Sequence, residues 1–141
     1  MHVFEPHGEY SLEIDDCIIK LFASGAANKE TIDAYVREVR SLVDSFAGAP
    51  FAMYSVYDQN VILTPEAEAV LALSIAERAE KGLCACALNL NNSTSRLIVS
   101  AQMDRLYKNA GVPWRTVNSY EESKPWLEAR IEEARKAKGK N

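Results

Sequence analysis

The residues best suited to chemistry in this chain are short polar side chains that follow predicted strands. They are Asp58, Asn60, Thr64, Asn89, Asn91, Asn92, Ser93 and Thr94. Because ligands of parallel α/β sheets bind at the carboxyl ends of strands, we expect these side chains to share one edge of the sheet. Their hydroxyls and amides can hydrogen-bond a polar, uncharged or amphiphilic group, whereas the carboxylate of Asp58 would oppose a simple phosphate. Helix caps and turns need the same residue types, and this structural role explains most of them without a ligand.

The sequence contains too few suitable residues for a metal site, a phosphate-binding loop or histidine-dependent catalysis. Cys84 and Cys86 alternate in a predicted strand, so both thiols should lie on the same face as small buried side chains. A metal site would need further ligands, and the chain offers only Cys17, His2 and His7. The two histidines are not close to the predicted edge, and the six glycines form no phosphate-binding loop. We therefore expect free thiols, no metal, no cofactor and no catalysis.

Length and composition indicate one domain. The chain has 141 residues, of which 48% are hydrophobic and 26% charged, and its formal net charge is -4. We expect a core over about residues 10–131 and a charged helix end at 132–141. Basic residues cluster only in that helix end, so no nucleic-acid surface is expected. No apolar run reaches the ~20 residues of a membrane helix, and the beginning lacks a signal-peptide pattern, so we expect a cytoplasmic protein without a membrane span.

Hydrophobic periodicity predicts the strands and helices that position the polar side chains. Alternating and apolar runs predict strands at residues 10–14, 17–23, 51–57, 83–90 and 112–117. The first two strands form a hairpin, and a helix follows each later strand as well as the second. The class is therefore α/β, with a five-stranded, mostly parallel sheet, an antiparallel N-terminal edge strand and four helices in the order β-β-α-β-α-β-α-β-α.

Capping residues mark the ends of these helices. The predicted N-caps are Asn28, Thr64 and Ser119. Glu122 lies three residues after Ser119, so the two predict a capping box in which hydroxyl and carboxylate each satisfy an open amide. Gly82 is the predicted left-handed cap of the second helix. Pro125 lies inside the last helix, so a kink or a second helix start at Ser123 is expected.

This element order resembles the SpoIIAA-like superfamily, the fold of STAS domains in anti-sigma-factor antagonists and in the cytoplasmic ends of anion transporters. The chain is most similar to small stand-alone bacterial members without a characterised function. The resemblance spans residues 10–131 and rests on the element order, on Asp58 at the end of the central strand, and on residues 114–122 followed by Trp126 and Leu127.

The resemblance also implies a test of one hydroxyl. Anti-sigma-factor antagonists carry an Asp-Ser-Ser/Thr-Gly type motif at the start of the helix after the central strand, and a partner kinase phosphorylates its hydroxyl. Here that helix opens with Leu63, Thr64, Pro65 and Glu66, which keeps one hydroxyl but lacks the Asp-Ser pair and the glycine. We expect Thr64 to be a structural cap and not a phosphorylation switch.

Two functions are compatible with these observations. The leading hypothesis is a non-enzymatic cytoplasmic binding or regulatory module of the STAS type, whose partner is another protein or a small polar or amphiphilic molecule. A homodimer is also compatible. The alternative is a small-molecule or lipid-binding protein with a pocket between sheet and helices. Residues that could line such a pocket are Met53, Tyr54, Tyr57, Met103 and Tyr107, although aromatic and Met residues at such spacing usually pack in a core.

Overall fold

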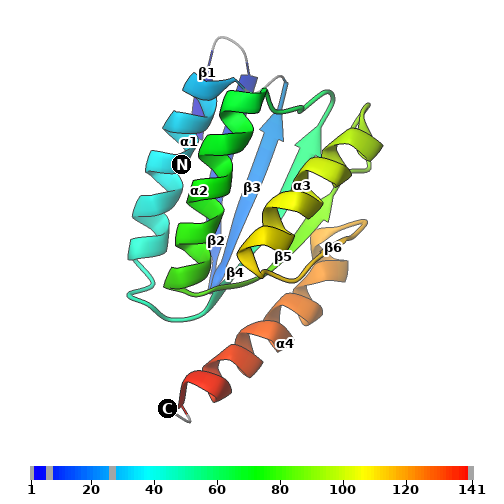
Figure 1. Ribbon diagram of the computed structural model, residues 1–141. Coiled ribbons are helices and arrows are strands. Elements are labelled where there is room, and N and C mark those ends of the chain that lie inside the picture. Colours follow the sequence, from blue (N-terminus) through cyan, green and yellow to red (C-terminus); the bar gives the residue numbers. More distant parts are fainter. Residues whose placement is uncertain (1, 6–7, 26–27, 140–141) are drawn as a thin grey trace.

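The computed structural model describes the backbone of residues 2–5, 8–25 and 28–139 and the side chains of residues 10–25 and 28–139 (Figure 1). Its strands are β1 (His2–Glu5), β2 (Gly8–Asp15), β3 (Ile18–Ser24), β4 (Phe51–Asp58), β5 (Leu83–Asn89) and β6 (Trp114–Thr116). Its helices are α1 (Lys29–Asp44), α2 (Pro65–Lys81), α3 (Arg96–Ala110) and α4 (Tyr120–Gly139). Residues 140 and 141 of the predicted charged end lie outside the described residues.

One sheet contains all six strands in the order β1-β2-β3-β4-β5-β6. The pairs β1–β2 and β2–β3 are antiparallel, and every later pair is parallel. The predicted class, the element order and the antiparallel position of β2 are confirmed. The structure adds β1, which pairs outside β2, so β2 is not the edge of the sheet. A strand of four residues is too short for its alternation to be recognised.

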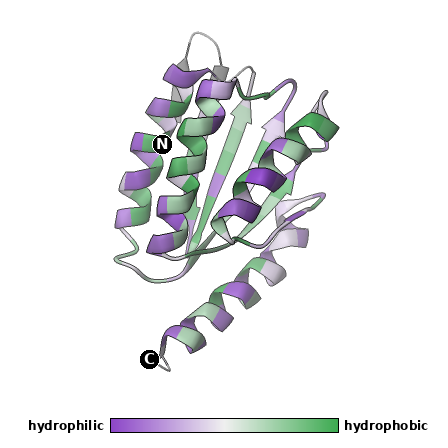
Figure 2. Ribbon diagram, viewed as in Figure 1, coloured by the Kyte–Doolittle hydropathy of each residue, from purple (hydrophilic) through white to green (hydrophobic). Residues whose placement is uncertain are grey.

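Three helices cover one face of the sheet and the fourth lies on the other. Parallel strands that are added in one direction through right-handed crossovers place every connecting helix on the same side. Helices α1, α2 and α3 accordingly lie side by side in Figure 1, whereas α4 runs at the lower edge. The hydropathy colouring shows mixed polar and apolar residues on each of these helices (Figure 2). The protein thus has two separate hydrophobic cores, one on each face.

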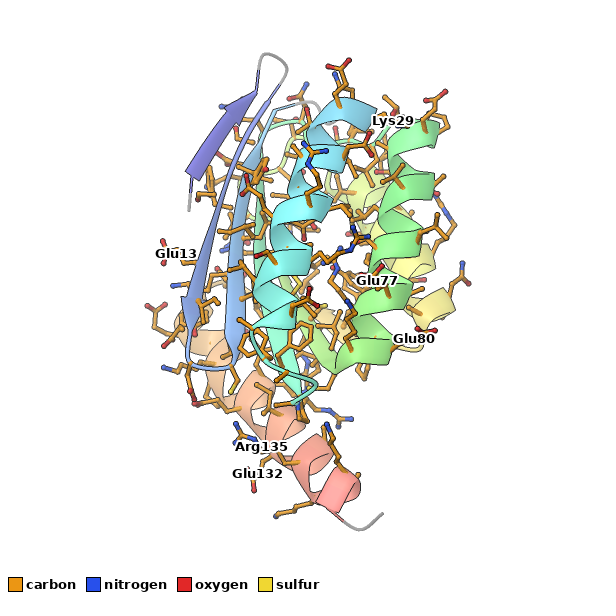
Figure 3. The ribbon with its side chains drawn as sticks, turned by 90° about the vertical axis from the view of Figure 1, so that its left-hand side faces the viewer. Glu13, Lys29, Glu77, Glu80, Glu132 and Arg135 are labelled. Carbon is orange, nitrogen blue, oxygen red and sulfur yellow. The ribbon has the colours of Figure 1, made fainter. Side chains whose placement is uncertain are left out.

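The larger core lies under α1, α2 and α3. Its largest fully buried side chains include Leu12, Ile19, Phe51, Met53 and Ile75. The five residues named as potential pocket lining at positions 53, 54, 57, 103 and 107 are all buried, residue 54 in the smaller core and the other four in the larger. Figure 3 shows the outer surface of the same layer, where Glu77 of α2 pairs with α1.

The smaller core holds α4 against β4 and β5. Leu127 and Ile131 of α4 are buried, and they pack with Ala52, Ala85 and Ala87 of the sheet. Alanine side chains on these strands let the helix approach the sheet closely. The attachment of α4 is therefore made by few large side chains.

The start of α4 is capped almost as predicted. The Ser119 hydroxyl accepts a hydrogen bond from the Glu122 amide at 3.1 Å. The Glu122 carboxylate accepts one from the Asn118 amide at 2.8 Å, one residue earlier than in a regular capping box. The helix continues through Pro125 as one element, so the second start at Ser123 does not occur.

A carboxylate on β2 also holds the start of α4. The Tyr120 hydroxyl donates a hydrogen bond to Asp15, and the Lys124 ammonium lies 3.2 Å from the same carboxylate. The hydrogen bond from Tyr120, and then that from Lys124, lowers the pKa of Asp15 below its ordinary value of about 3.8.

The lowered pKa predicts loss of stability in acid. A carboxylate with a lowered folded-state pKa stabilises the fold above its unfolded pKa, and this contribution disappears as the pH falls through the folded value. We expect wild type to be more stable than Asp15→Asn at pH 7, and this difference to shrink below about pH 3.8. Urea unfolding across this range measures it, with Asp16→Asn in the adjacent turn as the control. A pH-independent difference would contradict the prediction.

Candidate functional site

The predicted polar residues lie at the carboxyl edge of β4 and β5, where the loop after β5 is joined to Gln59. The Gln59 amide donates to the Asn92 carbonyl at 3.0 Å. The Gln59 carbonyl accepts from the Thr94 amide at 2.7 Å and from its hydroxyl at 3.1 Å. Ser93 forms an isolated bridge with Gln59, and its hydroxyl accepts from the Ser95 amide. These three residues therefore join two loops to each other.

Asn89 and Asn91 reach a third loop. The Asn89 side-chain amide donates to the Tyr54 hydroxyl at 3.0 Å and to the Asn118 carbonyl at 3.3 Å. The Asn91 side chain donates to the same carbonyl at 3.0 Å, and its backbone amide donates to the Asn89 side chain. The structure brings the asparagine-rich loop together as predicted, but much of its hydrogen-bonding capacity is used within the protein.

The remaining predicted residues lie at or after the end of β4, outside the asparagine-rich loop. Asp58 is the last residue of β4, in register with Ser24 of β3, and Asn60 is exposed in the turn that follows. Thr64 caps α2, and its hydroxyl accepts from the Ala67 amide at 3.2 Å. A shallow depression of about 320 Å³ separates the starts of α1 and α2, and Thr64 is one of its lining residues.

The capping bond of Thr64 predicts a modest structural effect. Thr64→Ala removes the acceptor of an amide in the first turn of α2, so the free energy of unfolding should fall by about 1 kcal/mol. Chemical denaturation measures this loss. Thr94→Ala, whose hydroxyl donates to a loop carbonyl, is a comparison outside any helix cap. Stoichiometric phosphorylation of Thr64 in cells would contradict a purely structural role.

The cysteines correct one prediction. The register between β4 and β5 shifts after Phe51. Phe51 pairs with Leu83, whereas the next residue, Ala52, pairs with Ala85. Cys84 packs with the smaller core and Cys86 with the larger, so the prediction that both thiols share a face is wrong. A bulge inserts one residue into the strand and moves the following side chains to the opposite face.

The thiol environments predict different reactivities. All three cysteines are free. Burial raises the pKa of Cys84 to about 11 and that of Cys86 to about 12, which leaves little thiolate at neutral pH. We expect a maleimide reagent to label Cys86 last and Cys84 slowly, with the partly exposed Cys17 as the internal reference. Mass spectrometry of peptides after timed labelling gives the order, and rapid labelling of Cys86 in the folded protein would contradict it.

A cavity lies between the sheet and the three helices, where the alternative hypothesis expected a pocket, and Tyr57 and Met103 of the five residues named for that pocket line it. It has a volume of about 40 Å³, enough for about three water-sized groups. Its lining is mostly apolar and is formed by Tyr10, Leu21, Ala23, Ser24, Gly25, Thr31, Ile32, Tyr35, Tyr57, Val61, Leu63, Leu71 and Met103. Ser24 and Gly25, at the carboxyl end of β3, are partly exposed, which places the rim at the edge where ligands of such sheets bind.

A buried guanidinium lies behind the wall of this cavity. Arg78 of α2 is 3% exposed, and its Nη1 donates to the Tyr35 hydroxyl at 3.0 Å and to the Met53 sulfur at 3.1 Å. Its other nitrogens donate to the carbonyl and the hydroxyl of Ser74 at 3.3 and 3.1 Å. All four acceptors are uncharged. Among the described residues, the ion pairs involve other cations.

The groups around Arg78 do not neutralise its charge. Burial raises the pKa of Tyr35, Tyr57, Tyr107 and Cys86, so each is uncharged at pH 7. Arginine stays protonated in proteins, and the negative end of α2 supplies only about half an elementary charge. The interior beside the cavity is therefore positive.

The sequence contains one signal for this arrangement. The buried residues of α2 include Ala67, Leu71, Ser74, Ile75 and Arg78. Four of them are small or apolar residues at helical spacing, and the arginine continues the same face. A charged residue on an otherwise buried helix face is the feature that identifies the site.

Comparisons with protein-family models, curated proteins and solved structures give no match to this chain.

No helix within residues 2–5, 8–25 and 28–139 has both the length and the apolar character needed to cross a membrane. Among those same residues, no three His, Cys, Asp or Glu side chains gather as a potential metal site. His2 lies in β1, and His7 is outside the described residues.

Proposed function

We propose that this protein is a non-enzymatic binding module whose ligand is a small molecule held in the cavity between the sheet and α1, α2 and α3. The observation that carries this proposal is the apolar cavity at the carboxyl end of β3 and β4, with tyrosines in its wall. Small-molecule sites are concave and largely apolar, with a few polar groups that fix orientation. The volume of about 40 Å³ has room for about three water-sized groups, which favours a ligand that inserts a short apolar part into the cavity.

Titration with 1-butanol, followed by NMR chemical shifts, tests this proposal. We expect saturable shifts at the methyl groups of Leu63, Leu71 and Met103, which line the cavity. Ala23→Leu fills the cavity from β3 and should abolish these shifts, whereas Ala69→Leu adds the same atoms on the exposed side of α2 and should preserve them. Shifts that persist in Ala23→Leu, or that are confined to the opposite edge around Gly82 and Gly111, would contradict it.

A regulatory role of the STAS type is the second candidate, and exposed apolar residues beside the asparagine-rich loop favour it. Leu97 and Ile98, in the first turn of α3, are 88% and 53% exposed. Arg96 precedes them, the first turn contains no acidic residue, and no side chain caps the helix. Exposed apolar residues beside positive charge fit a protein partner that presents an apolar and an acidic side chain.

Paired variants test this second candidate. Leu97→Asp places a carboxylate in the surface, and Leu73→Asp makes the same change at a 76% exposed leucine of α2. Each variant is purified from host cells together with its bound proteins. We expect one partner that binds wild type and Leu73→Asp but not Leu97→Asp. Equal retention or equal loss of the partner by both variants would contradict a role for this surface.

A further inference from the structure

The guanidinium beside the cavity is a charged donor whose acceptors are all neutral. The Arg78 guanidinium donates to Tyr35, so the Tyr35 oxygen acts as an acceptor and its own proton remains available to a third group. No acceptor for that proton is found among the described residues. Tyr57 also lines the cavity, and its buried phenol is close enough to Tyr35 and Arg78 for each of them to affect its pKa. A positive charge that polarises neutral donors is an arrangement that binds an anionic acceptor.

A second observation shows that this buried cluster is incomplete. Ser55 lies on β4 between Met53 and Tyr57, on the face that α1, α2 and α3 cover, and it is 1% exposed. Its hydroxyl lies close enough to Tyr57 to affect the pKa of the phenol, but no hydrogen bond with acceptable geometry joins the two. Buried hydroxyls are rarely left without a partner, so Ser55 has unused hydrogen-bonding capacity in the same layer, although it is not one of the lining residues.

The charge in this layer decides the class of that group. An isolated buried cation is strongly unfavourable, and its interaction with an anion is much stronger in the interior than in water. The surface arginine on α1 illustrates the contrast, because Arg40 pairs with Glu77 at 2.8 Å. Arg78, next to Glu77 in the sequence, has only neutral acceptors.

We propose that the cavity binds a short organic monocarboxylate, with its apolar part against the leucine and methionine side chains and its carboxylate hydrogen-bonded to Tyr35 and Tyr57 in the field of Arg78. This inference rests on the proposed function, since it assigns the ligand class of the same cavity. An inorganic anion would leave the apolar wall unused, whereas a neutral molecule would leave the buried charge uncompensated.

Matched ligands separate the two proposals. Butyrate and 1-butanol share a similar apolar chain and differ in charge, and calorimetric or NMR titration at constant ionic strength gives the affinity of each. We expect wild type to bind butyrate at least tenfold more tightly than 1-butanol. Arg78→Met should lose this preference and keep 1-butanol binding, and Tyr35→Phe should reduce it several-fold. Arg105→Met removes an exposed, paired arginine from α3 and should change neither affinity.

The possible results are distinguishable. If neither ligand shifts the cavity residues, the proposed function itself is wrong. If 1-butanol binds at least as tightly as butyrate, or if Arg78→Met and Tyr35→Phe both keep the full preference, the cavity binds small molecules but the inference of an anion is overturned. If chloride displaces butyrate and binds as tightly, the site holds any small anion and the organic class is wrong. Tyr35→Phe keeps the test valid even if Arg78→Met does not fold.

Discussion

Leu127→Ala is expected to lower the free energy of unfolding by about 3 kcal/mol, because it removes the most deeply buried side chain that α4 places on the sheet. Among the described residues of α4, only Leu127 and Ile131 are buried apolar members of the smaller core, and the alanines of β4 and β5 cannot move to fill the space. The larger core lies across the sheet and keeps its contacts. The loss should therefore be concentrated in α4.

Hydrogen exchange and urea unfolding measure this effect together. In Leu127→Ala, the amides of α4 should lose protection before those of α1, α2 and α3, since local opening follows the weakest cooperative unit. Leu73→Ala is the control, because the same atoms are removed from an exposed position of α2 and the change should stay within about 0.5 kcal/mol. A loss below about 1 kcal/mol for Leu127→Ala, with α4 protection unchanged, would show that this core is not what holds the helix.

Gly82→Ala is the second substitution with a large expected effect. Gly82 ends α2 with φ of 125° and ψ of 1°, outside the left-handed region that the sequence predicts for this cap. A Cβ atom at Gly82 would lie 2.8 Å from the carbonyl oxygen of Ala49, which is backbone and cannot turn away. Backbone strain and this clash together should cost about 3 kcal/mol.

A second glycine separates the two contributions. Gly111 caps α3 with φ of 73°, and a Cβ atom there would meet nothing within 4 Å. Gly111→Ala therefore adds strain without a clash and should cost about 1 kcal/mol. Denaturant midpoints of the two variants give the comparison. Equal losses would mean that the contact with Ala49 relaxes and that only the backbone conformation matters.

Local signals explain why most of the fold could be predicted. The caps Asn28 and Thr64 lie where a polar side chain must satisfy the first open amides, and the structure shows both capping bonds. The parallel order follows from strands that alternate with helices. Strand β1 and the bulge near Cys84 were not predicted. The strand is too short to show an alternating pattern of apolar and polar residues, and the bulge interrupts such a pattern.

The candidate site was only partly predictable, for a different reason. Residue type and position correctly placed Asn89 and Asn91 at the carboxyl edge, but they did not reveal that Asn118 uses their side-chain donors. The cavity depends on how distant elements pack, since β3, α1 and α3 all contribute to its wall. The sequence shows Arg78 as a charged residue on an otherwise apolar helix face. Only its tertiary environment makes this observation informative.

The order of the strands has a consequence for how the chain folds. Each strand pairs with the one that precedes it in the sequence. In a nascent chain, each new strand can therefore pair with a strand that has already been synthesised. Such sequential pairing keeps the loops to be closed short, which favours fast folding for a largely parallel sheet. Only α4 docks on strands that are already paired, because β4 and β5 both precede it in the sequence. We expect its docking to be the final step of folding and the first to be reversed.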